Sequence, residues 1–141
     1  MKVKKVERVA IAVTDLEAAR GFFERVLGAA FQDVEDVADQ GFRYQPFTVA
    51  GFTLELLCPY QESSSIAKFL REHGPGVHHV SFEVEDLDEA IASLAAVGVS
   101  IVGRLEYPPG VLFEGQRWRE AFVHPRQAFG VLLHICEKKP A

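Results

Sequence analysis

A repeat inside the chain constrains its fold more than any other feature. The segment VAIAVTDLEAA at 9–19 is matched at a constant offset by VSFEVEDLDEA at 80–90. In each copy, alternating apolar residues indicate a strand, an aspartate (Asp15 or Asp86) stands at a helix N-cap position, and an amphipathic helix then runs to a glycine. Such self-similarity predicts two copies of one structural unit.

More strands are expected after each predicted helix, which ends at Gly28 in one copy and Gly98 in the other. We expect them at about 30–37, 42–49 and 52–58 in the first half and at about 99–106, 117–123 and 130–137 in the second. The pair Ala50-Gly51 predicts a hairpin. The predicted fold class is therefore α+β, with two tandem βαβββ modules whose open sheets meet around one small-molecule site.

The 141 residues are expected to form one domain. Module one covers about 1–58, a connector about 59–76, and module two about 77–141. Within the connector, three serines at 63–65 predict the cap of a short helix that runs to about His73. The loop YPPGVLFEGQ at 107–116 is predicted to be irregular and to border a site.

Composition narrows the class of partner. With 20 acidic and 15 basic residues, the formal charge of −5 offers no electrostatic footprint for nucleic acid or an anionic membrane. No apolar stretch is long enough to cross a bilayer and no signal peptide is evident, so we expect a cytoplasmic protein with a small-molecule partner. The two cysteines, Cys58 and Cys136, are predicted to be buried thiols.

Strand alternation places ionisable residues on the face turned away from the helices. That face carries Arg8 in the first strand and His79 in its repeat counterpart, each accompanied by small residues that leave room for a ligand. Glu55 and His134 hold equivalent places in the last strand of each half. Pseudo-two-fold packing of the halves would bring all four residues toward one point.

Two imidazoles and a carboxylate form a set that suits a divalent metal ion with open positions for substrate or water. We therefore predict Glu55, His79 and His134 as metal ligands. Arg8 cannot ligate a metal, so it either pairs with Glu55 or binds an anionic group of the substrate. If it pairs with Glu55, the pocket could hold no metal at all.

Other polar residues allow two interpretations. Tyr44 is either a core residue or a hydroxyl donor in the pocket. The segment Arg117-Trp118-Arg119 is interpreted first as a solvated edge strand and second as a contact for an anionic substrate. Packing or other structural roles are expected for the remaining histidines, His73, His78 and His124.

The motifs together resemble a known superfamily over nearly the whole chain. Four segments are similar to those of the vicinal oxygen chelate superfamily, which includes glyoxalase I, and most of all to its methylmalonyl-CoA epimerases. They are VAIAVTDLEAARGFFERVLG, FTLELLCP, HHVSFEVEDLDEAI and FVHPRQAFGVLLHI. The resemblance implies a cupped mixed sheet around a central pocket and a divalent metal (Co, Zn, Mn, Ni or Fe). It also implies a homodimer, and proton abstraction beside a thioester with an enolate held by the metal.

The site residues of such epimerases match this chain only in part. The resemblance implies His in the first strand, Gln or Glu in the fourth, His in the strand that opens the second half, and Glu in the last. Glu55 and His79 fit this pattern, but Arg8 replaces the first His and His134 replaces the last Glu. His134 or Tyr44 would then have to act as the base, and Arg8 would bind the anionic substrate.

Three functions remain open at this point. The first is a metal-dependent isomerase, epimerase or lyase that acts on a small carboxylate or acyl-CoA thioester. The second is a non-haem Fe(II) dioxygenase, because two His and one carboxylate are the ligands of that class. The third is a metal-free binding or resistance protein in which Arg8 and Glu55 form an ion pair. Fold alone does not rank them.

Overall fold

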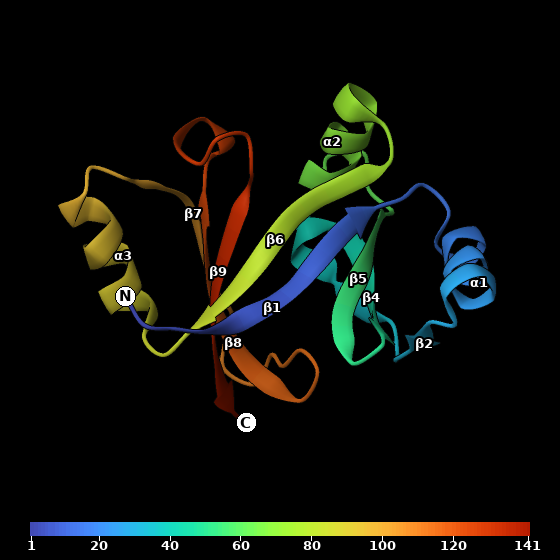
Figure 1. Cartoon of the computed structure of the whole chain (residues 1–141), viewed down its shortest axis with the longest axis horizontal. Coiled ribbons are helices and arrows are strands. Elements are labelled where there is room, and N and C mark those ends of the chain that lie inside the picture. Colours follow the sequence, from blue (N-terminus) through green and yellow to red (C-terminus); the bar gives the residue numbers. More distant parts are fainter. The chain divides into compact units, whose positions relative to one another are not determined.

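The computed structural model describes residues 1–141. The chain forms two compact units: residues 8–78 make one, and residues 1–7 together with 79–141 make the other. Two long strands contribute to both units, β1 (Val3–Ala12) and β6 (Gly76–Val84) (Figure 1). Each unit is described by itself.

The unit of residues 8–78 is a small sheet with two helices. Its strands follow the order β2-β4-β5-β1, with β5 parallel to β1 and antiparallel to β4, and β3 also pairs with β4. After β1 the elements are α1 (Leu16–Leu27), β2 (Ala30–Phe31), β3 (Glu35–Val37), a 3-10 turn η1 (Ala38–Gln40), β4 (Phe42–Val49), β5 (Phe52–Pro59) and α2 (Ser65–His73).

Helix α1 begins and ends where local chemistry requires. The Asp15 carboxylate accepts a hydrogen bond from the backbone N–H of Ala18 at 3.0 Å, which satisfies a donor that the first helical turn leaves unpaired. Gly28 ends the helix in the left-handed conformation, with φ of 64°. The apolar side of α1 packs on a core of the sheet that includes Phe47 and Leu56, both fully buried.

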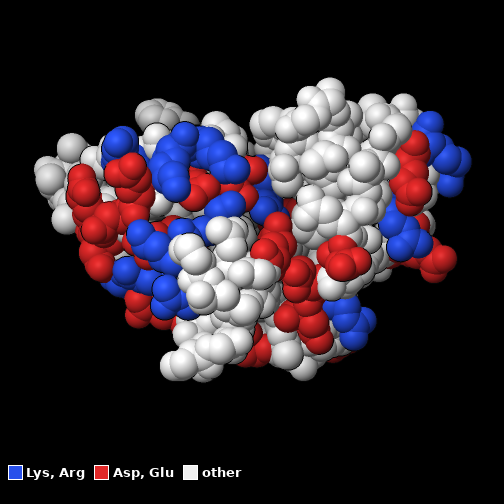
Figure 2. Space-filling model, turned by 90° about the horizontal axis from the view of Figure 1, so that it is seen from below, with Lys and Arg blue, Asp and Glu red and all other residues white.

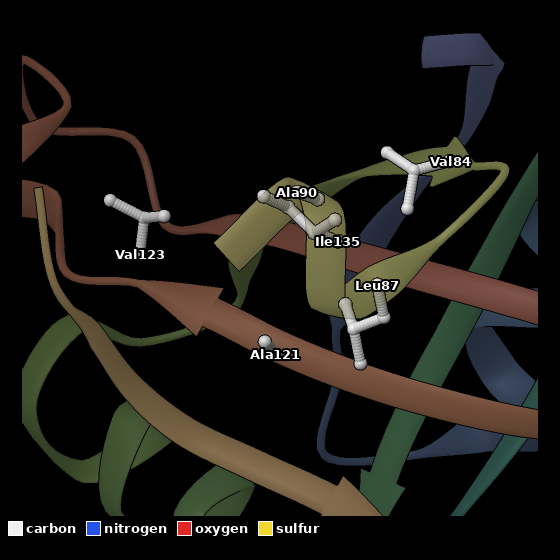
Figure 3. Close-up of a cluster of buried hydrophobic side chains, with 6 residues drawn as sticks. All are labelled: Val84, Leu87, Ala90, Ala121, Val123 and Ile135. Atoms are coloured by element: carbon white, nitrogen blue, oxygen red, sulfur yellow. The ribbon is translucent and has the colours of Figure 1, made fainter. Parts of the chain in front are cut away.

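The other unit repeats this plan. Its strands follow the order β6-β9-β8-β7. After β6 the elements are α3 (Leu87–Ala96), β7 (Ile101–Glu106), β8 (Gln116–Val123), a 3-10 turn η2 (Pro125–Gln127) and β9 (Leu133–Pro140). The Asp86 carboxylate caps α3, and the helix lies over one face of the sheet, where its Leu87 and Ala90 pack with strand residues such as Ile135 (Figure 3).

The predicted α+β class with two βαβββ modules is confirmed. The hairpin at Ala50-Gly51 is confirmed as well, with φ of 51° and 80° at these residues, and α2 is capped by Ser64 and ends at His73. Whether the two modules form one domain with the predicted boundaries, and whether their sheets surround a shared pocket, stay predictions. No helix is both long and apolar enough to cross a membrane.

Two strand predictions were inaccurate. The single strand expected at 30–37 is divided into β2 and β3. Both pair with β4, but the ladder is interrupted after Gln32, whose carbonyl accepts from the Gln45 side chain at 2.8 Å. The last strand begins at Leu133 rather than at residue 130, because Phe129 and Gly130 have positive φ values of 55° and 90° that no strand accommodates.

Candidate functional site

Arg8 and Glu55 form a buried ion pair in the unit of residues 8–78. The Arg8 Nη1 lies 3.3 Å from the Glu55 Oε2, and the two side chains are only 5% and 9% exposed. Residue Ala10, which follows Arg8 on the same face of β1, is the direct neighbour of Glu55 in the parallel β1–β5 pairing. Of the two roles predicted for Arg8, the structure shows the pairing with Glu55.

Tyr44 lies on the same face of the sheet as this ion pair. In the antiparallel pairing of β4 with β5, Tyr44 is opposite Leu57 and Pro46 is opposite Glu55. Residues directly opposite each other share a face, and so do residues two apart along a strand. Tyr44 is buried, at 7% exposure, so the core position that the sequence allowed is correct; a role in the pocket stays a prediction.

His134 is the centre of a hydrogen-bonded cluster in the other unit. Its Nδ1 lies 2.5 Å from the hydroxyl of Ser81, and its Nε2 lies 2.5 Å from Oε1 of Glu120. The phenol of Tyr107 donates to the second carboxylate oxygen, Oε2 of Glu120, at 2.6 Å. Four side chains from β6, β8, β9 and the loop after β7 are thus connected in one chain of hydrogen bonds.

Strand register explains why these residues meet. Ser81 is the parallel partner of His134, and Phe122 is its antiparallel partner on β8. Glu120, two residues before Phe122, lies on the same face of the sheet. Helix α3 covers the opposite face, where Ala121 and Ile135 belong to its core, so the cluster lies on the face without the helix, as predicted for His134.

Three members of this cluster were not selected from the sequence as functional residues. Ser81 was placed on the correct face but given no role, and Glu120 and Tyr107 were not considered. Alternation alone could have placed Glu120 inward, because it shares a face with the buried Trp118. Its contact with His134 depends on the β8–β9 register, which a single sequence does not fix.

His79 is the second histidine of this unit. Its ring centroid lies 5.0 Å from that of His134 and 5.8 Å from that of Phe122, and the residue is 7% exposed. The structure therefore brings together two of the predicted site residues in each unit: Arg8 with Glu55, and His79 with His134. Convergence of all four at one point stays a prediction.

A cluster of buried charges continues the same face toward the end of β9. Lys138 Nζ lies 2.8 Å from Glu7 Oε1 and 3.6 Å from Glu83 Oε1. Cys136, between these groups and Glu120, is fully buried. Burial raises the pKa of its thiol far above the ordinary value, and the negative charge of Glu7 acts in the same direction. Both effects disfavour the thiolate form of Cys136.

The residues do not fit a metal ion in the arrangement observed. His134 has a protein partner at both ring nitrogens, and Glu55 is bonded to a guanidinium. No group of three or more His, Cys, Asp or Glu side chains is placed to hold a metal. A metal on Glu55, His79 and His134 would first have to displace Arg8 and rotate His134, so this ligand set stays a prediction.

The remaining predictions had mixed outcomes. The interpretation of Arg117-Trp118-Arg119 as a solvated edge strand is wrong, because β8 lies between β7 and β9 and Trp118 is only 8% exposed. Cys136 is buried as expected, but Cys58 is only half-buried. His78 packs edge-on against the ring of Phe69.

These features define a class of protein. Residues 7–122 match the Glyoxalase/Bleomycin resistance protein/Dioxygenase superfamily, and the chain has the paired βαβββ modules implied by that resemblance. The protein belongs to this superfamily, as its motifs indicated.

Within the superfamily, the chain is similar to proteins named as epimerases. An ethylmalonyl-CoA/methylmalonyl-CoA epimerase of Cereibacter sphaeroides is 34% identical over 134 residues, which are 94% of this chain and 97% of the relative. A crystal structure of methylmalonyl-CoA epimerase from Mycobacterium tuberculosis has a TM-score of 0.81 at 34% identity, covering 99% of this chain and 89% of that one. A methylmalonyl-CoA epimerase in complex with methylmalonyl-CoA and NH4+ has a TM-score of 0.80 at 28% identity, covering 96% and 95%.

Proposed function

We propose that this protein is an epimerase-like isomerase that moves a proton at the carbon next to the carbonyl of a small anionic carboxylate or acyl-CoA thioester. The observation that carries the proposal is the hydrogen-bonded pair of the buried His134 and the partly buried Glu120, at 2.5 Å. Relatives named methylmalonyl-CoA epimerases support the reaction class and the choice of substrate.

The Glu120 carboxylate is the proposed proton acceptor. His134 contacts one oxygen of this carboxylate and Tyr107 donates to the other, so both oxygens are held in fixed positions. Both ring nitrogens of His134 already have partners, so the imidazole serves to orient Glu120 and to share the accepted proton. The base, which the sequence assigned to His134 or Tyr44, is thus proposed to be the Glu120–His134 pair.

The proposed reaction has two stages, removal of a proton and its return. The C–H bond breaks, the proton moves to a Glu120 oxygen, and the electron pair enters an enolate. Burial of His134, at 4% exposure, keeps the pair in a low-dielectric environment, where hydrogen bonds to charge are stronger. Epimerisation also requires a proton to return on the opposite face of the carbon, and we assign that step to the hydroxyl of Tyr44, the other residue predicted as catalytic. The protonated Glu120 then releases its proton to solvent and the Tyr44 phenolate takes one from solvent, which restores the starting state.

The first experiment is deuterium exchange. The protein is incubated with methylmalonyl-CoA in D2O, and proton NMR follows the signal of the methyl group, which changes when the neighbouring carbon acquires deuterium. Exchange well above the buffer rate supports the proposal. Binding of the thioester without exchange would instead support a different function.

That different function is a metal-free binding or resistance protein, and one observation favours it. The buried Arg8–Glu55 pair balances its own charges and could hold the ligand pocket together without chemistry. Titration calorimetry with acyl-CoA thioesters, after dialysis against a chelator, tests it: affinity without turnover is the expected result. No observation favours the oxygenase, which would require His134 to release a ring nitrogen to iron.

Several finer assignments complete the proposal. Arg8 is proposed to lie beside the anionic group of the substrate while it remains paired with Glu55. Binding of Co, Zn, Mn, Ni or Fe by Glu55, His79 and His134, a homodimeric state and a cytoplasmic location are kept as predictions. Elemental mass spectrometry and sedimentation analysis test the first two.

A further inference from the structure

A groove outside the Glu120–His134 cluster has no role in the proposed reaction. It has a volume of about 910 Å³ and lies where the loop after β7 passes the ends of β8 and β9. Basic and acidic side chains gather on part of the face shown in Figure 2. The groove is lined by Tyr107, Pro109, Arg117, Trp118, Arg119 and Lys139, among others.

Two of the lining residues are like charges placed directly opposite each other. Arg117 on β8 is the cross-strand partner of Lys139 on β9, and such like-charged pairs are destabilising. The next pair on the same face, Arg119 with Glu137, has opposite charges and forms an ion pair at 3.4 Å. The chain therefore balances one pair and leaves the adjacent one with two positive charges.

Neighbouring side chains do not neutralise these two cations. The side-chain carboxylates that line the groove, Glu106 and Glu137, are both bonded to Arg119, at 3.0 and 3.4 Å; Ala141 also lines the groove. Arg117 makes its hydrogen bond from Nε to the carbonyl oxygen of Pro140 at 3.0 Å. That bond fixes the guanidinium and leaves its two terminal nitrogens for another acceptor.

We propose that this groove binds a phosphate-bearing group through Arg117 and Lys139. A guanidinium and an ammonium side by side suit a phosphate, because the first donates in a planar fork and the second acts as a point charge. The overall charge of −5 would repel an anion, so attraction must come from this local pair. The sequence interpretation of Arg117 as a contact for an anion is retained on this basis.

The phosphate has two possible sources. Arg117 and Lys139 alternate to the sheet face opposite Glu120. Tyr107, however, which comes after the edge strand β7, both lines the groove and donates to Glu120 of the proposed catalytic pair. On the proposed function, the groove would then hold the phosphorylated nucleotide end of an acyl-CoA thioester. A separate phosphate ester that binds without the thioester has the same chemistry, and the ligands chosen below distinguish the two.

Titration calorimetry with coenzyme A, dephospho-coenzyme A, pantetheine and inorganic phosphate tests the proposal. These probes need no turnover, so failure of the proposed reaction would leave the result interpretable. Trp118, the single tryptophan of the chain, lines the groove and reports binding there by its fluorescence. The variant is Arg117→Ala/Lys139→Ala; the matched controls, Arg126→Ala and Lys68→Ala, remove exposed cations elsewhere.

We expect coenzyme A to bind the parent and both controls equally, and the double variant at least about tenfold more weakly, as for loss of charge-assisted hydrogen bonds. Weak binding of pantetheine with tight binding of coenzyme A identifies the thioester carrier as the source. Inorganic phosphate that binds as tightly as coenzyme A, and competes with it, identifies a free phosphate ester. Unchanged affinity of the folded double variant for every phosphate-bearing probe would overturn the proposal.

Discussion

At the residue scale, His134 and Arg8 are each held by partners from neighbouring strands. His134 lies on the sheet face without a helix, where it contacts Ser81 of β6 and Glu120 of β8. The register of the whole sheet sets these contacts. Arg8 of β1 is paired with Glu55 of β5, and both side chains are buried.

Tyr44→Phe tests how the proton returns. If Tyr44 protonates one face of the carbon and Glu120 the other, the variant should still exchange deuterium into one enantiomer while inversion falls by about 10²-fold or more. Chiral separation of the product, combined with NMR, measures both rates on the same sample. Equal losses of exchange and inversion would show that Tyr44 does not act on one face alone.

The Arg8–Glu55 pair makes a prediction about stability. Arg8→Met should lower the free energy of unfolding by about 3 kcal/mol or more, because it leaves a buried carboxylate without its cation. Adding Glu55→Gln should restore most of that loss, since the remaining groups are uncharged. Urea denaturation of the parent, both single variants and the double variant completes the cycle; additive losses would argue against a coupled pair.

At the element scale, the repeat and the capping residues predicted most of the fold. Three of the predicted helix ends are confirmed: Asp15 and Asp86 are the N-caps of α1 and α3, and Gly28 is the C-cap of α1. The inaccurate predictions concerned strands. The break between β2 and β3 depends on a hydrogen bond to a distant residue, and the late start of β9 depends on the positive φ at Phe129. Such features have no local pattern in the sequence.

An ion network ties the first turn of α3 to the sheet. Asp88 lies 2.6 Å from Arg104 and 2.9 Å from Arg119, and their hydrogen bonds lower the pKa of Asp88 below the ordinary value of 3.8. A lowered pKa in the folded state means that the stabilisation is present above that ordinary value and is lost as the pH falls through the folded pKa.

Thermal unfolding between pH 7 and pH 3 tests this assignment. Asp88→Asn should reduce the stability at pH 7 modestly, because the pair is exposed. The variant should also lose less stability than the parent on acidification. Asp33→Asn, at an exposed position in the other unit, serves as the control. Parallel curves for parent and Asp88→Asn would show that the network does not contribute.

At the scale of the whole molecule, the chain has the fold of its superfamily, and its candidate site contains contacts that the repeat does not predict. It belongs to the Glyoxalase/Bleomycin resistance protein/Dioxygenase superfamily, and its two modules repeat one plan. Arg8 and His134 are each bonded to a carboxylate in the structure. Fold could therefore be predicted from the repeat, whereas the site depends on contacts that the repeat does not encode.

Metal content follows from the same arrangement. Glu55 and His134 are engaged by other side chains, so the parent purified without a His tag or chelator should contain less divalent metal than a variant in which the guanidinium is absent. Arg8→His, which removes the guanidinium and adds a ligand, should raise the bound metal. Elemental mass spectrometry measures both. A full equivalent in the parent that disappears in His79→Ala would instead establish the predicted three-ligand site.

The most direct test of the account compares deuterium exchange into methylmalonyl-CoA by the parent and by Glu120→Gln. The variant keeps the shape and a hydrogen-bond acceptor for His134 but removes the proposed proton acceptor, so the exchange rate should fall by about 10²- to 10⁴-fold with little change in thioester affinity. Glu120→Asp should recover part of the rate. An exchange rate in folded Glu120→Gln within a few-fold of the parent would contradict the assignment of the Glu120–His134 pair as the base.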